Sequence, residues 1–149
     1  MKPKSYRRKA SRRRSEPSAA VAKPDPAAAQ VVHNVLAELP RLMAVAVVDV
    51  ESGASLAAHS NMPGIDPTMA AAHNAEVVKL KQKAMTALQL VGEQIEDILI
   101  TLSNQLHLLQ LTTNGSRLIY LVVSTQNTNL GIARAVLRAQ VGQLEQSVR

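Results

Sequence analysis

The sequence contains no cysteine, no tryptophan and no phenylalanine, and each absence excludes a class of function. Without cysteine the chain can form no disulfide, thiolate metal site or cysteine nucleophile. This fits a reducing compartment, and we expect a cytoplasmic protein. Because Tyr6 and Tyr120 are the only aromatic residues, the chain offers no stacking platform for single-stranded nucleic acid. Its core must be aliphatic.

Long apolar runs and nucleotide-binding loops are missing as well. No run reaches the roughly 20 apolar residues that span a bilayer. Neither GxxxxGK[ST] nor GxGxxG occurs, so we expect no nucleotide cofactor. The histidines show no metal-ligand spacing, and no GxSxG elbow accompanies the serines; these histidines are His33, His59, His73 and His107. We therefore expect a protein that is not an enzyme and holds neither cofactor nor metal.

Positive charge is concentrated at the N-terminus. Residues 1–30 carry nine Lys/Arg and two acids, a formal charge of +7, whereas the remainder carries eight and nine, a formal charge of −1. Residues 1–25 also lack a periodic apolar face, so we expect a disordered basic tail over 1–25 and a folded domain over 26–149. The basic side chains that could contact nucleic acid or anionic lipid are Arg7, Arg8, Lys9, Arg12, Arg13 and Arg14. A merely solubilising arm is an equal alternative.

The first part of the domain predicts a helix followed by two strands. Apolar residues recur at helical spacing over 32–39, and Pro40 ends that helix. Residues 43–50 are rich in β-branched side chains and apolar on both faces, which predicts a strand covered on both sides. Gly53 suits the turn into a weaker strand over 54–60.

The second part predicts a long helix, three strands and a last helix. Asp66 and Pro67 favour a helix start, and we expect that helix to run to Val91. Three apolar strands follow, with a hairpin at Asn114-Gly115; they cover residues 95–102, 106–111 and 118–123. Apolar spacing from residue 130 to 148 predicts a C-terminal helix. The fold class is therefore α+β, a five-stranded antiparallel sheet covered by helices on both faces in the order α-β-β-α-β-β-β-α.

The long helix carries two apolar faces. The larger is predicted to lie on the sheet and comprises Met69, Val77, Leu80, Ala84, Leu88 and Val91. The smaller consists of Val78 and Met85, flanked by Asn74 and Lys81, and is predicted to pack on a neighbouring helix. Strand 95–102 has few charges to blunt its edge, so it is a pairing hazard unless a partner uses it.

These segments, in this order, resemble the Roadblock/dynein light chain family, and its stand-alone bacterial branch in particular. The resemblance covers residues 32–146 and is carried by HNAEVVKLKQKAMTAL, then IEDILITLSNQLHLLQL, then LIYLVVS followed by NLGIARAVL. It implies a dimer in which edge strands pair and the two central helices lie side by side. It also implies an interaction platform, often for small Ras-like GTPases; one bacterial relative accelerates GTP hydrolysis, whereas others act as scaffolds.

We therefore expect a homodimeric adaptor or regulator that scaffolds or modulates a small Ras-like GTPase without chemistry of its own. The residues expected at its interface are Asn74, Val78, Lys81, Met85, Glu96, Ile98 and Ile100. An activator of GTP hydrolysis can supply an arginine finger, and the candidates here are Arg117, Arg134 and Arg138; a solvated helix charge is the favoured interpretation of the last two. The alternative function is a nucleic-acid- or anionic-membrane-associated protein that acts through its basic arm, with the domain serving only to dimerise it.

Overall fold

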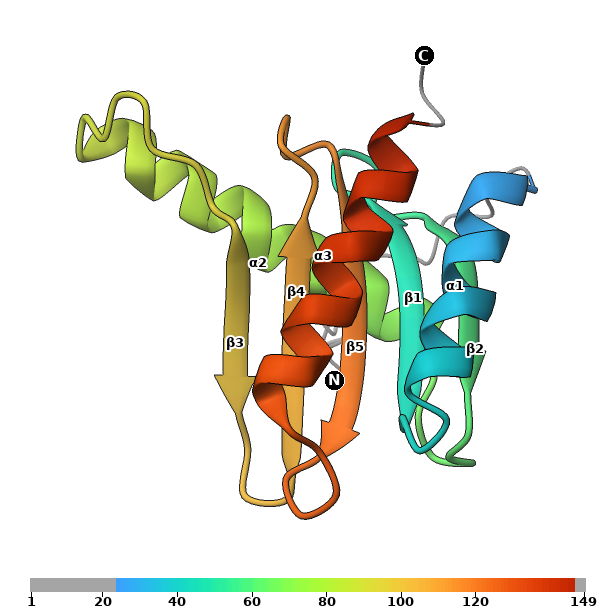
Figure 1. Ribbon diagram of the computed structural model, residues 1–149. Coiled ribbons are helices and arrows are strands. Elements are labelled where there is room, and N and C mark those ends of the chain that lie inside the picture. The colour runs from blue at the N-terminus through green and yellow to red at the C-terminus, as the bar shows by residue number, and fades with distance from the viewer. Residues whose placement is uncertain (1–23, 147–149) are drawn as a thin grey trace, which may run out of the picture.

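A five-stranded antiparallel sheet with helices on both faces organises residues 24–146, the part of the chain that the computed structural model describes (Figure 1). The elements are α1 (Pro26–Glu38), β1 (Ala44–Asp49), β2 (Ser55–Ser60), α2 (Pro67–Ala87), β3 (Asp97–Thr101), β4 (Gln105–Leu111), β5 (Arg117–Ser124) and α3 (Leu130–Gln146). The strands lie in the order β2-β1-β5-β4-β3, so β2 and β3 are the sheet edges. The predicted fold class and element order are confirmed. The predicted disordered tail lies outside the described residues except for its last two positions.

α1 and α3 lie side by side on one face of the sheet (Figure 1). Asp25 caps α1 by accepting a hydrogen bond from the Ala28 backbone N–H at 3.0 Å, which is why the helix begins at Pro26. Asn34 donates to Gln140 of α3 at 3.1 Å, joining the two helices. Between these helices and the sheet lies an aliphatic core whose fully buried members include Val47, Ile119, Leu121 and Leu137.

α2 covers the opposite face and packs chiefly on β1 and β2. Three of the apolar side chains that it buries, Ala71, Ala75 and Val78, are small and share a core cluster with Ala44 and Ala46 of β1. Small residues on both elements let the helix and strand backbones approach closely. This close fit selects the face of α2 that meets the sheet.

The prediction of which side of α2 faces the sheet is therefore wrong. Leu80 is 71 % exposed and Leu88 is 65 % exposed, whereas Val78 is fully buried. Helical periodicity assigned the large apolar residues of α2 to the sheet, but the surface of β1 has room only for the small ones. The predicted sheet face points away from the core, with half-buried Ala84 and exposed Met69, Val77, Leu80, Leu88 and Val91.

α2 also ends earlier than predicted, at Ala87 rather than Val91. Gln89 takes a left-handed conformation with φ of 56°, and its N–H donates to the Thr86 carbonyl at 3.0 Å. The Leu90 N–H donates to the Met85 carbonyl at 3.1 Å, which completes a Schellman closure. The sequence placed this stop at Gly92, because glycine is the residue that usually adopts positive φ.

The β4–β5 turn confirms the hairpin predicted at Asn114-Gly115. Gly115 has a φ of 70°, a conformation that a side chain would strain. The Asn114 side-chain oxygen accepts hydrogen bonds from the Ser116 N–H at 3.0 Å and from its hydroxyl at 2.7 Å. This turn lies at the end of the sheet where β3 begins and β1 ends, and it forms part of the surfaces described below.

Candidate interaction surface

β3 leaves one side of its backbone without a strand partner. Among the described residues it pairs with β4 and with no other strand, which confirms that the predicted edge strand lies at an edge. Ile98 and Ile100 face the α2 side of the sheet and are half-buried. The Asp97 carboxylate accepts hydrogen bonds from Arg134 Nε at 3.1 Å and Nη2 at 3.2 Å, on the α3 side of the sheet. Its charge is therefore paired and does not prevent a second strand from pairing with this edge. An apolar edge of this kind is a ready template for another strand.

The C-terminal half of α2 projects beyond β3 (Figure 1). Because the helix packs on β1 and β2, its last turns have no strand of their own sheet beneath them. Leu80 and Leu88 are exposed on these turns, and Val91, in the connection to β3, is 93 % exposed. An apolar row on a projecting helix, next to an unpaired strand, is the kind of surface that marks an interaction site.

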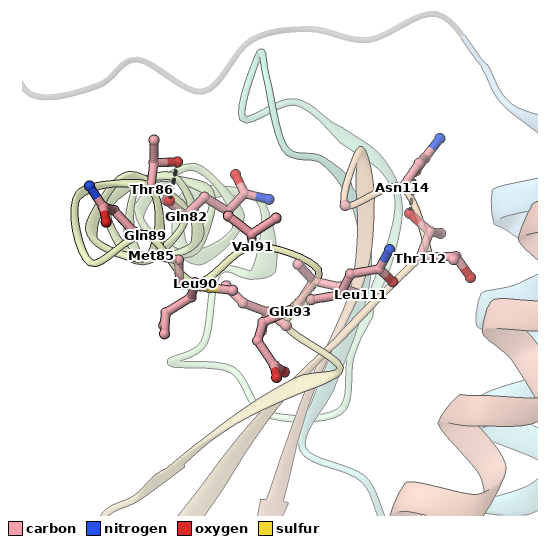
Figure 2. Close-up of a pocket in the computed structure, with 14 residues that line it drawn as sticks. Gln82, Met85, Thr86, Gln89, Leu90, Val91, Glu93, Leu111, Thr112 and Asn114 are labelled. Carbon is pink, nitrogen blue, oxygen red and sulfur yellow. Dashed lines mark hydrogen bonds between the residues drawn. The ribbon is translucent and has the colours of Figure 1, made fainter.

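A hollow of about 670 Å³ lies between the end of α2, the connection to β3 and the β4–β5 turn. Figure 2 shows Val91 between the end of α2 and Leu111 of β4. Apolar side chains such as Met85 and Leu90 line it together with the amides of Gln82 and Gln89. The hollow extends the apolar row of α2 toward the sheet.

The seven predicted interface residues fall into two groups. Val78 is fully buried and Asn74 is 9 % exposed, so both face the core of their own chain, and their predicted place at the seam with a neighbouring helix is corrected. Lys81 is exposed and Met85 is half-buried on the projecting half of α2. Glu96, Ile98 and Ile100 lie at or beside the β3 edge. The interface role of these last five residues stays a prediction.

A buried polar network crosses the α2 face of the sheet, and sequence reasoning missed it. The Tyr120 hydroxyl lies 2.8 Å from His107 Nδ1, and His107 Nε2 lies 2.9 Å from Gln105 Oε1. Since Gln105 Oε1 can only accept, Nε2 carries the proton of the neutral ring and the Tyr120 hydroxyl donates to Nδ1. The sequence feature that could have revealed this network is the lone tyrosine in an aliphatic strand, because a buried tyrosine normally needs a polar partner.

Burial sets the titration of this network. Desolvation lowers the pKa of His107. Desolvation likewise raises the pKa of Tyr120, and a hydrogen bond from Asn74 opposes that rise. Asn74 therefore links α2 to the sheet, which explains why a polar residue sits on the buried face of the helix.

The three arginines considered as arginine fingers are all ion-paired. Arg134 forms a bidentate ion pair with Asp97, so the interpretation of Arg134 as a solvated helix charge is wrong. Arg117 lies 3.6 Å from Asp25, and Arg138 lies 3.9 Å from Glu96.

Residues 24–146 contain no group of three or more histidine, aspartate or glutamate side chains placed to hold a metal ion. In that same part of the chain, no helix is long and apolar enough to cross a membrane. The six basic tail residues predicted to contact nucleic acid or lipid, Arg7 to Arg14, lie outside it.

Comparison with solved structures identifies the fold. Myxococcus xanthus MglB matches with a TM-score of 0.71 at 15% identity, over 87% of this chain and 94% of that chain. The Roadblock/LC7 domain from Streptomyces avermitilis matches with a TM-score of 0.67 at 12% identity, over 80% and 96%. The gliding protein MglB from Thermus thermophilus gives 0.64 at 16%, over 87% and 96%. No protein-family model matches the chain, and no curated protein does. The fold is Roadblock-like, as the sequence resemblance implied.

Proposed function

We propose that the protein is a homodimeric, non-enzymatic adaptor that regulates a small Ras-like GTPase in the cytoplasm. The observation that carries the proposal is that, within residues 24–146, the outer edge of β3 has no strand partner and the apolar row of α2 is exposed. A lone chain leaves both features in water, which costs free energy and invites aggregation.

A two-fold axis beside the middle of β3 would cover both features at once. Antiparallel pairing of two β3 strands satisfies their free backbone groups and joins the two sheets. The same rotation carries the projecting half of each α2 over the partner's Ile98 and Ile100. Leu80 and Leu88 then lie in the interface, while Val78 and Asn74 hold each helix on its own sheet.

The GTPase part of the proposal rests on the resemblance and on the fold. The solved structures with this fold include a gliding protein, MglB, and a Roadblock/LC7 domain. The sequence resembles a family whose members often serve small Ras-like GTPases. Because the sequence contains no phosphate-binding loop, the partner would hold the nucleotide. This protein would then bind the GTP form and the GDP form of the partner with different affinities.

The test is capture of Ras-like GTPases from the same genome by the immobilised full chain. We expect one GTPase to bind with a preference for the GTP-analogue or the GDP form, and Leu80→Asn/Leu88→Asn to abolish that binding. Ile132→Asn, the same kind of change at an exposed apolar residue of α3 on the other face of the sheet, is the control and should bind normally. Binding that ignores the nucleotide, or survives the double substitution, would contradict the proposal.

A further inference from the structure

The turn between β4 and β5 places an amide beside a peptide nitrogen that can react with it. Asn114 is the one asparagine of the sequence that a glycine follows, and the others all precede residues with side chains. Asn114 and Ser116 are exposed, so water reaches the amide. Because Gly115 has no side chain, its peptide nitrogen can approach the side-chain carbon of Asn114 closely.

Hydrogen-bond donors converge on the side-chain oxygen of Asn114, Oδ1. The Ser116 N–H donates to it at 3.0 Å, and the Ser116 hydroxyl donates to it at 2.7 Å. The Thr112 hydroxyl lies 3.0 Å from Oδ1 and shares its proton with the Arg117 carbonyl at 3.2 Å. Since a backbone N–H can only donate, the amide atom that faces Ser116 is the oxygen. Two donors of one residue are therefore directed at Oδ1.

The same bonds hold the Asn114 side chain over Gly115. A side-chain oxygen that accepts from the N–H two residues further on closes an Asx turn, which spans the peptide in between. That peptide nitrogen belongs to Gly115, and its N–H donates to the Thr112 carbonyl at 2.9 Å. The bond to Thr112 must open before the nitrogen can react.

The two effects on the reaction rate differ in size. Opening one exposed turn hydrogen bond slows the reaction by roughly five-fold. Fixed donors at a developing oxyanion raise the rate by about 100- to 1,000-fold in enclosed sites. Water weakens such donors at an exposed turn, but a small part of that effect already exceeds the loss. The folded turn therefore favours attack on the Asn114 amide.

We propose that Asn114 is a site of spontaneous deamidation that the folded turn promotes. Hydroxide removes the Gly115 N–H proton, and the nitrogen forms a bond to Asn114 Cγ. The N–H and the hydroxyl of Ser116 stabilise the negative charge that develops on Oδ1. The bond from Cγ to Nδ2 then breaks, ammonia leaves with a proton from water, and a cyclic imide remains. Water opens the imide at either carbonyl, which gives aspartate or isoaspartate.

Isoaspartate changes the turn more than aspartate does. It carries the backbone through the former side chain and adds a methylene group before Gly115. Gly115 already lies close to α2, since a Cβ built on it would lie 2.8 Å from Gln82 Nε2. The longer backbone therefore displaces the Gln82 side chain or moves the turn away from α2. Either change alters the hollow that Gln82, Asn114 and Gly115 line (Figure 2).

Incubation of the full chain in native buffer, followed by peptide mass spectrometry that separates aspartate from isoaspartate, tests the proposal. We expect Asn114 to react faster than every other asparagine, with isoaspartate as the larger product. Ser116→Ala removes the hydroxyl donor and should slow the reaction by about five-fold or more. Ser116→Thr keeps a hydroxyl and should keep most of the rate. Ser103→Ala, in the exposed turn between β3 and β4, is the matched control and should leave the rate unchanged.

Urea separates the reaction of the folded turn from the reaction of unfolded chains. In urea Ser116 no longer faces Oδ1, so the parent chain and Ser116→Ala should react at equal rates. Equal rates in native buffer as well would mean that the reaction runs through unfolded molecules, and this would overturn the proposal. A faster reaction of Ser116→Ala in native buffer would mean that the hydrogen bonds protect Asn114, and it would overturn the proposal too. So would an Asn114 that stays unmodified in the folded parent chain.

Discussion

Replacing Val78 by alanine is expected to destabilise the folded chain, whereas replacing Leu80 by alanine is expected to weaken only the dimer. The two residues lie two positions apart on α2 and face opposite ways, since Val78 is fully buried and Leu80 is 71 % exposed. Sequence periodicity assigned them the other way round. The pair of substitutions therefore tests which side of α2 meets the sheet.

The magnitudes follow from the groups removed. Val78→Ala deletes two buried methyl groups and leaves a cavity, which costs about 2–3 kcal/mol of folding free energy. Leu80→Ala removes a mostly exposed side chain, so the folding cost is below about 0.7 kcal/mol and is partly offset by the helix propensity of alanine. In a symmetric dimer the lost contact counts twice, about 2–4 kcal/mol, or roughly a 30- to 1,000-fold rise in the dimer Kd.

Urea unfolding and sedimentation equilibrium, each at several protein concentrations, separate the two effects because dimerisation makes apparent stability concentration-dependent. Val78→Ala should lower the unfolding midpoint at every concentration. Leu80→Ala should shift the monomer–dimer equilibrium and leave the monomer midpoint nearly unchanged. A large loss of monomer stability for Leu80→Ala, with little for Val78→Ala, would refute the packing described for α2.

Three further predictions concern separate features of the fold. Gln89→Gly should raise stability by about 0.5–1 kcal/mol by relieving the positive φ at the end of α2, and a decrease in a thermal or urea scan would contradict this. Asp97→Asn should cost about 1 kcal/mol through the lost Arg134 pair, whereas Glu96→Gln, in a long exposed pair, should cost far less in the same scan. Because the folded-state pKa of His107 lies below the unfolded value of 6.5, the unfolded chain binds more protons, and stability should fall as pH drops through 6.5; His107→Gln should flatten that dependence.

The fold was largely predictable from the sequence because its signals are local. Asp66-Pro67 fixes the start of α2, Asn114-Gly115 fixes the β4–β5 turn, and β-branched runs predict the central strands. These features depend on backbone preferences of a few neighbouring residues. Tertiary packing does not need to override them.

The candidate surface was less predictable because it depends on which face of α2 packs. Helical spacing shows that α2 has two apolar faces, but only the small side chains of β1, such as Ala44 and Ala46, decide between them. The alternatives differ by a rotation of the helix that leaves the element order unchanged. The Asn74–Tyr120–His107 network was missed for a similar reason, since it joins three elements distant in sequence.

Disulfide cross-linking along β3 tests the proposed dimer most directly, because the chain has no cysteine of its own. Single cysteines at Ile98, Leu99 and Ile100 are compared with one at Ala58, an exposed residue of the opposite edge strand β2. Antiparallel self-pairing of β3 places one position opposite itself, within the roughly 4.4–6.8 Å Cα separation that a disulfide requires. We expect efficient cross-linking at a single β3 position and none at Ala58. Equal cross-linking at all positions, or cross-linking at Ala58 alone, would contradict a dimer built on β3 and α2.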